Sequence, residues 1–189
     1  PNEGQDIIAQ RLKSAGPNSL SLIGANLGKN KDTGQEKTPE DYANLYETFS
    51  PLSDYLVINI SSPNTPGLRA LQSKEGFRAI CEAVDEKRKT NRKPLYLKIA
   101  PELEKSDMKD LIELCKEYAL SGLIATNTSL KHDQGAGGLS GRLMTEEAKV
   151  ARELALDMTR ETTDLSVIAA GGISSFKDIL DFWNKGGRL

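Results

Sequence analysis

Residues 55–61 read YLVINIS, an almost continuous run of branched and aromatic side chains that ends on polar residues. Such a run, without strict alternation of polar and apolar residues, is typical of a strand buried on both faces, as in a parallel sheet. Four other runs have the same character. Together they predict five strands, at 20–27, 55–61, 94–100, 122–127 and 166–171.

The segments between these runs carry apolar residues at the spacing of three and four that one face of a helix requires. Thr38 and Thr145 are each predicted to cap a helix, and Ser174 or Ser175 to begin the last one. The predicted buried stripes are Phe77, Ile80, Cys81 and Val84; Met108, Leu111, Ile112, Cys115 and Tyr118; Val150, Ala151, Leu154, Ala155 and Met158; and Ile179, Leu180 and Trp183. Both cysteines therefore fall on core faces.

Five consecutive βα units predict an α/β fold with a parallel sheet and right-handed crossovers. A closed barrel and an open doubly wound sheet both satisfy this order. No G-x-G-x-x-G follows the first strand, which favours the (β/α)8 or TIM barrel. A complete barrel usually takes about 250 residues, whereas this chain has 189, so we expect about five of the eight units.

Composition narrows the functional classes. The chain has 25 Lys and Arg against 27 Asp and Glu, mixed along its length, so we expect no nucleic acid or anionic membrane surface as a direct partner. Two separated cysteines and one histidine make a disulfide framework or a zinc site unexpected. No signal peptide or membrane-spanning run is recognisable, so this chain is expected to be soluble.

Polar residues stand at the ends of the predicted strands, where both architectures place ligands. They are Asn26, Asn59, Lys98, the Thr126-Asn127-Thr128 triplet and the Gly171-Gly172 pair. These residues supply amides, hydroxyls and one ammonium but no carboxylate. Their chemistry argues against hydrolysis by paired carboxylates or by a metal. They favour a planar, amide-rich ligand held by hydrogen bonds, and no metal site is expected.

Two of these features suggest what the ligand carries. Lys98 has no carboxylate partner on the predicted strands, so we expect it to face negative charge on a ligand, such as a reduced flavin. Gly171-Gly172 would offer backbone N–H groups to a phosphate before a helix N-terminus, and residues 137–141 could form a second wall. Plainer readings exist for each: glycines and asparagines form turns, and Lys98 could extend to solvent. His132 is interpreted as a solvated loop residue.

Residues 59–65, NISSPNT, followed by Gly67-Leu68-Arg69, resemble the active-site loop of the dihydroorotate dehydrogenases, in particular the quinone-dependent class 2 enzymes. Further segments match the same family in the same order: 26–30, 98–101, 126–128, 137–141 and 171–172. The resemblance implies a (β/α)8 barrel that binds FMN. It also implies oxidation of (S)-dihydroorotate to orotate in de novo pyrimidine biosynthesis, with a quinone as final electron acceptor.

The resemblance also implies residue roles. Ser62 would be the base that removes a substrate proton, Thr65 a proton relay, and Lys98 the group that stabilises the reduced flavin. The FMN contacts would be Asn26, Asn59, Lys98, Thr126, Gly141, Gly171 and Gly172, and the substrate contacts Asn59, Ser62, Asn64, Asn127 and Thr128. The soluble class carries cysteine where Ser62 stands, so this residue also indicates the class.

The match to the family implies that residues 1–189 form a partial FMN-binding barrel, approximately strands three to seven, with 186–189 entering the eighth. The full-length protein would then be a peripheral membrane protein of a bacterial or mitochondrial inner membrane, attached through a segment outside this chain. Two alternatives remain open. The chain could be a non-catalytic piece of a barrel with open sheet edges, or it could belong to another FMN-barrel dihydropyrimidine oxidoreductase, a group that typically uses cysteine at position 62.

Overall fold

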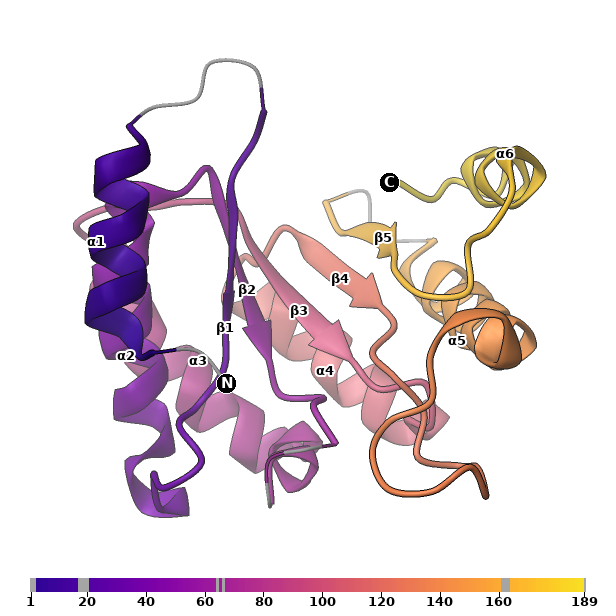
Figure 1. Cartoon of the computed structure of the whole chain (residues 1–189), viewed down its shortest axis with the longest axis horizontal. Helices are drawn as coiled ribbons and strands as arrows, with labels where there is room; N and C mark the ends of the chain where they lie inside the picture. Colours follow the sequence, from indigo (N-terminus) through magenta and orange to yellow (C-terminus); the bar gives the residue numbers. More distant parts are fainter. Residues whose placement is uncertain (1–2, 17–20, 64, 66, 161–163, 189) are drawn as a thin grey trace.

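A single curved sheet organises the molecule. The computed structural model describes residues 3–16, 21–63, 65, 67–160 and 164–188. Its five strands are parallel and adjoin in sequence order (Figure 1): β1 (Gly24–Leu27), β2 (Tyr55–Asn59), β3 (Leu95–Ile99), β4 (Gly122–Ala125) and β5 (Ser166–Ala169). All five predicted strands are present, each shorter than its apolar run. The consecutive order confirms the prediction of successive βα units.

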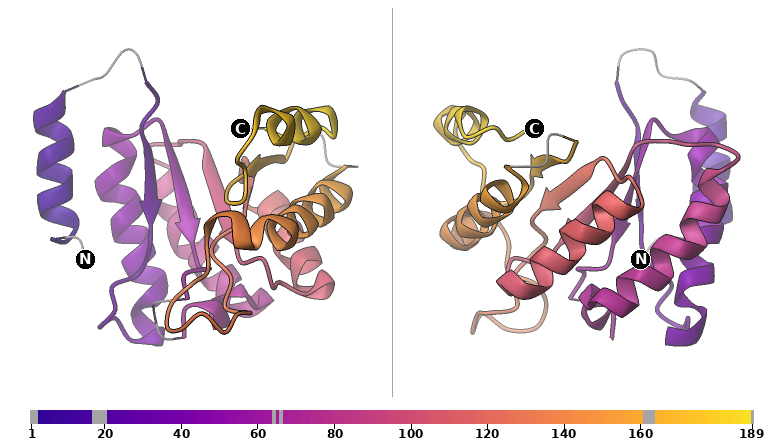
Figure 2. Two further views of the ribbon diagram at one scale, coloured as in Figure 1. Left: turned by 45° about the vertical axis from the view of Figure 1, so that its right-hand side comes forward. Right: turned by 180° about the vertical axis from the view of Figure 1, so that it is seen from behind.

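Helices follow the strands and pack as a layer outside the sheet (Figure 2). They are α2 (Thr38–Phe49), α3 (Lys74–Arg88), α4 (Lys105–Glu117), α5 (Thr145–Thr159) and α6 (Phe176–Asn184). A further helix, α1 (Gln5–Ala15), precedes β1 and packs against α2. The sequence patterns did not predict α1. Parallel strands with this outer layer form part of a (β/α)8 barrel, as expected.

The two faces of the sheet differ in burial. Side chains that point to the helices are almost completely buried, for example Leu56, Leu97 and Leu123. Most of their neighbours on the other, inner face are only half-buried: Tyr55, Asn59, Tyr96, Lys98 and Ile124. Val57 is an exception, because it pairs with Tyr96 on this face and is buried. Among the described residues, the expectation of strands buried on both faces therefore fails for most of the inner face. The inner face is the one that lines a barrel interior.

Beyond α6 the chain returns to the sheet. The Arg188 backbone N–H donates to the carbonyl of Val167 at 2.8 Å, and the Ala169 N–H donates to the carbonyl of Arg188 at 3.1 Å. These bonds pair Ile168 with Arg188 in parallel. This pairing is the geometry expected of a strand that would follow β5.

Two predicted helix caps are wrong, and one is right. Thr38 and Thr145 are the first residues of α2 and α5, because a short 3-10 turn runs directly into each helix. The Thr38 hydroxyl donates to the carbonyl of Gly34 at 3.1 Å instead of capping. Ser175 does cap α6, in a reciprocal arrangement with Asp178.

The predicted buried stripes are correct for α3 and α4 and partly wrong for α5 and α6. Cys81 and Cys115 are free, buried core residues, as expected. Val150, Leu180 and Trp183 are 66%, 42% and 54% exposed, although the Arg188 guanidinium lies over the Trp183 ring. No helix in the described ranges is long and apolar enough to cross a bilayer.

Candidate functional site

Strand register places polar residues near the strand ends on one face of the sheet. Asn59 of β2 pairs with Lys98 of β3, and Asn26 of β1 pairs with Val57. Paired residues of neighbouring parallel strands project from the same face, and side chains alternate between faces along a strand. Asn26, Asn59 and Lys98 therefore share the inner face at the carboxyl ends of the strands, where the sequence placed them.

A hydrogen-bonded cluster joins the ends of β2 and β4. The Asn59 side-chain oxygen accepts from the Ser61 hydroxyl at 3.0 Å and from the Asn127 amide at 3.2 Å. The Asn127 amide also donates to the Ser61 hydroxyl at 3.0 Å, and the Thr128 N–H donates to the Asn127 side chain at 2.9 Å. Ser61, which was not predicted as a site residue, is fully buried at the centre of this cluster.

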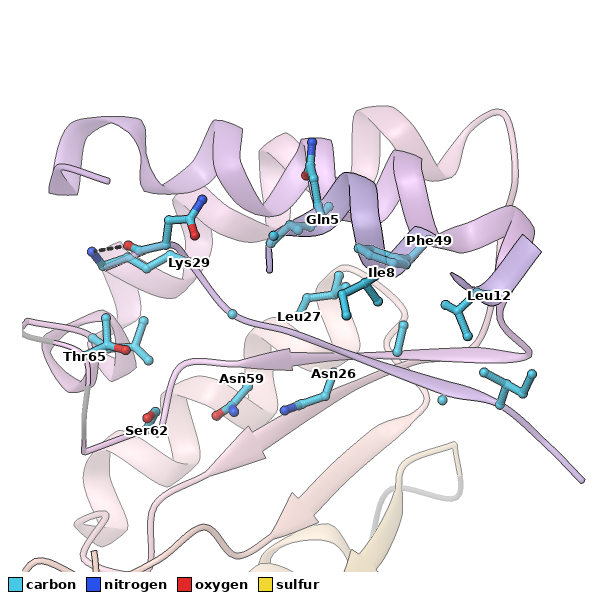
Figure 3. Close-up of a pocket in the computed structure, with 18 residues that line it drawn as sticks. Gln5, Ile8, Leu12, Asn26, Leu27, Lys29, Phe49, Asn59, Ser62 and Thr65 are labelled. Carbon is cyan, nitrogen blue, oxygen red and sulfur yellow. Dashed lines mark hydrogen bonds between the residues drawn. The ribbon is translucent and has the colours of Figure 1, made fainter. Parts of the chain in front are cut away.

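A cavity of about 480 Å³ opens beside this cluster. Four predicted site residues line it: Asn26, Asn59, Ser62 and Thr65. Figure 3 shows Asn26, Asn59 and Ser62 in a row along the strand ends, with Thr65 beyond Ser62. The structure thus brings the two predicted proton-transfer residues and two predicted ligand amides to one space.

Lys98 is a partly buried cation without a counterion. Its ammonium makes no hydrogen bond or ion pair with any residue that the structure describes. Burial lowers the pKa of Lys98 below its usual value, because the charged form loses hydration that no protein group replaces. An unpaired ammonium next to Asn59 is a ready partner for an anionic or strongly polar ligand.

The Gly171-Gly172 turn follows β5 at the far end of the same rim. Both glycines have positive φ, 81° and 65°. A Cβ on Gly172 would lie 2.9 Å from the Thr145 Cα, so only glycine allows the turn to approach α5 this closely. The Arg152 guanidinium donates to the Gly171 carbonyl, and Arg152 is almost completely buried.

The backbone N–H groups of this turn divide into two sets. Those of Gly171 and Gly172 donate to none of the described residues. Those of Ser174 and Ser175 donate to the Asp178 carboxylate at 3.0 and 2.8 Å. The predicted anion site can therefore use the glycine turn, but the amides at the start of α6 are already occupied.

The loop after β4 folds back over the rim. Ser129 and Leu139 pair in an antiparallel bridge, and Gly138 lies so close to Thr128 that a Cβ would overlap its hydroxyl. His132 holds the tip of this hairpin, its Nε2 lying 2.9 Å from the carbonyl of Gly137. His132 is thus a loop residue, as expected, and it is partly buried.

The sequence model of the family described as "Dihydroorotate dehydrogenase" matches residues 1–188. The chain belongs to the dihydroorotate dehydrogenase family. It is 39% identical to the dihydroorotate dehydrogenase (quinone) of Thermus thermophilus over 97% of this chain and 53% of that protein. With the enzyme of the same name from Sulfurimonas denitrificans, the identity is 41% over 94% of this chain and 50% of the relative.

A solved structure has the same fold. The dihydroorotate dehydrogenase of Eimeria tenella in complex with ferulenol superposes with a TM-score of 0.89 and 29% identity, covering 98% of this chain and 58% of that one. The chain thus spans about half the length of the curated relatives it matches.

Within this dihydroorotate dehydrogenase family member, the predicted site residues divide between two regions of the rim. Asn26, Asn59, Ser62 and Thr65 line the cavity. The others lie farther along, at the ends of β3, β4 and β5 or in the loops that follow them: Lys98, Thr126, Asn127, Thr128, Gly141, Gly171 and Gly172. Asn64 lies outside the described residues. The amide of Asn127 joins the two regions through Asn59 and Ser61.

Proposed function

We propose that the protein containing this chain oxidises (S)-dihydroorotate to orotate in de novo pyrimidine biosynthesis, with FMN as hydride acceptor and a quinone as final electron acceptor. The observation that carries the proposal is the unpaired Lys98 ammonium beside the Asn59–Ser61–Asn127 cluster, with Ser62 in the adjoining cavity. The relatives named dihydroorotate dehydrogenase (quinone) support this reading over another dihydropyrimidine oxidoreductase.

The residues present fit a flavin mononucleotide. A cation without a counterion suits the pyrimidine part of the ring, and the free N–H groups of Gly171 and Gly172 suit the phosphate. When bound, FMN supplies the acceptor for the two electrons that leave the substrate. The residues proposed to hold it are Asn26, Asn59, Lys98, Thr126, Gly141, Gly171 and Gly172.

Ser62 and Thr65 are proposed to remove the substrate proton. A serine hydroxyl is far from ionised at neutral pH, so Ser62 has to pass its own proton onward as it accepts one from carbon. Thr65 lines the same cavity and is the proposed next acceptor. Asn59, Asn127 and Thr128, with the predicted Asn64, would orient the substrate ring by hydrogen bonds, which makes proton and hydride removal geometrically possible.

The test is Ser62→Ala in the full-length protein, with the exposed Ser106→Ala on α4 as a matched control. We expect both variants to retain flavin. Anaerobic mixing with dihydroorotate should bleach the flavin of the Ser106 variant at the normal rate and that of the Ser62 variant at least about 100-fold more slowly. An unchanged rate in Ser62→Ala would refute the role of this residue. Faster reduction by dihydrouracil than by dihydroorotate would refute the substrate.

Contact with a membrane is proposed through a segment outside this chain, since a lipid-soluble quinone is the proposed acceptor. The support is the quinone in the names of the relatives. Flotation of the full-length protein with phospholipid vesicles tests this proposal. Protein that stays at the bottom of the gradient would contradict it.

A further inference from the structure

Arg69 forms three hydrogen bonds beneath the rim, to three different loops. Its Nε donates to the carbonyl of Ser61 at 3.2 Å. One terminal nitrogen donates to the Glu102 carboxylate and the other to the carbonyl of Thr128, each at 2.9 Å. All three nitrogens of the guanidinium thus donate to protein groups, which fixes the orientation of the Arg69 side chain.

The first of these contacts concerns Ser62 directly. The carbonyl of Ser61 belongs to the peptide unit that links Ser61 to Ser62, so Arg69 fixes the orientation of the backbone that enters Ser62. The hydroxyl of the same Ser61 is held from the other side by Asn59 and Asn127. Ser61, the residue that precedes Ser62, is therefore held through both its carbonyl and its side chain.

Glu102 completes the arrangement from the loop after β3. Its carboxylate binds Arg69, accepts from the Ser129 hydroxyl at 3.0 Å and accepts from the Leu130 backbone N–H. Burial tends to raise the pKa of Glu102, but the Leu130 N–H and the Arg69 charge outweigh it and hold this pKa below its usual value. Glu102 therefore stays ionised at neutral pH and holds both Arg69 and the loop that begins at Thr128.

We propose that Arg69 and Glu102 are positioning residues that hold Ser62 and Thr128 in one fixed geometry across the ends of β2 and β4. The inference rests on the proposed function, in which Ser62 takes the proton and Thr128 contacts the substrate. A planar guanidinium can hold two carbonyls and a carboxylate at once, whereas a lysine ammonium cannot reproduce this fork. Small displacements of reacting groups cost large factors in rate.

The experiment uses Arg69→Lys, Glu102→Gln and the double variant in the full-length protein, with Arg78→Lys as the matched control. Arg78 forms a comparable ion pair with Glu117 between α3 and α4, at the outer surface. We measure flavin content, the midpoint of urea unfolding, the dissociation constant of orotate, and the rate of flavin reduction at saturating dihydroorotate.

We expect Arg69→Lys to retain flavin. Dihydroorotate should reduce this flavin about 10- to 100-fold more slowly than the flavin of Arg78→Lys, with a much smaller change in orotate affinity. Glu102→Gln should slow reduction less. The double variant should be no slower than Arg69→Lys, because both residues act through one hydrogen-bonded unit. A purely structural role would lower the unfolding midpoint without this separation of rate from affinity.

Three results would overturn the inference: a reduction rate in Arg69→Lys within about twofold of the Arg78→Lys control, multiplicative slowing in the double variant, or loss of orotate affinity with an unchanged rate. If Arg69→Lys loses its flavin, Glu102→Gln decides by the same rate and affinity criteria. If dihydroorotate does not reduce the flavin of the unmodified protein, the proposed function itself is refuted, independently of Arg69.

Discussion

Tyr42 and Tyr46 lie one turn apart on α2 and allow the stability of the barrel to be separated from the geometry of the site. Both rings are fully buried. The Tyr42 hydroxyl donates to the carbonyl of Asn59 at 2.8 Å. The Tyr46 hydroxyl donates to the carbonyl of Asn91 at 2.9 Å and accepts from the Lys93 N–H at 3.0 Å.

Tyr42 thus has one backbone partner, at the carboxyl end of the strands, whereas Tyr46 has two, before β3. Replacing either with phenylalanine keeps the ring and removes these buried hydrogen bonds. At about 1 kcal/mol for each bond, Tyr42→Phe should lose about 1 kcal/mol of unfolding free energy and Tyr46→Phe about 2 kcal/mol. The midpoint of urea unfolding of the full-length protein, compared at equal slope, measures this loss.

Only Tyr42→Phe should also affect ligands, because only its partner, Asn59, belongs to the site. We expect flavin and orotate to bind roughly 3- to 10-fold more weakly to Tyr42→Phe, a loss of about 0.7–1.4 kcal/mol, and to bind normally to Tyr46→Phe. Quenching of flavin fluorescence measures the affinity for flavin, and the spectral shift of bound flavin measures the affinity for orotate. Equal effects of the two variants on binding, or full stability of Tyr42→Phe, would refute the reasoning.

Two further predictions concern Gly172 and Lys98. Gly172→Ala should destabilise the protein by about 1–3 kcal/mol more than Gly16→Ala. The reason is that φ is positive at both glycines but only Gly172 has backbone within 3.0 Å of the new Cβ. Equal shifts of the unfolding midpoint would contradict this prediction. In flavin-free protein, the depressed pKa of Lys98 means that the folded state binds fewer protons than the unfolded state as pH approaches about 10. The unmodified protein should therefore gain stability relative to Lys98→Met as pH rises through this range, and a difference independent of pH in paired urea titrations would contradict the assigned cause.

The strands and their polar ends were predictable because they depend on local patterns. The outer face of each strand must be apolar to pack under the helices, and a run such as 95–99 shows this directly. The last residues of such a run lie near the rim whatever its exact register. The positions of Asn26, Asn59 and Lys98 therefore followed from the chain alone.

Other features depend on contacts between distant segments, which the sequence does not display. The helix α1 carries few apolar residues, and Ile8 and Leu12 form its contact with the core only because α2 lies beside it. Arg69 was visible only as part of a motif, because its partners, two backbone carbonyls and the Glu102 carboxylate, lie on three separate loops. The predicted caps at Thr38 and Thr145 were wrong because a 3-10 turn runs directly into each helix.

Asn59 of β2 pairs with Lys98 of β3 in the sheet. Side chains along a strand alternate between the helix-covered face and the barrel interior, so a one-residue shift exchanges the two sets completely. Inserting a residue in β2 would place a polar amide under α2 or α3 and an isoleucine in the barrel interior. The chemistry of the rim can therefore diversify by substitution, whereas changes in length are confined to the loops beyond the strand ends. A barrel of this kind therefore tolerates a substitution at the rim better than a shift of strand register.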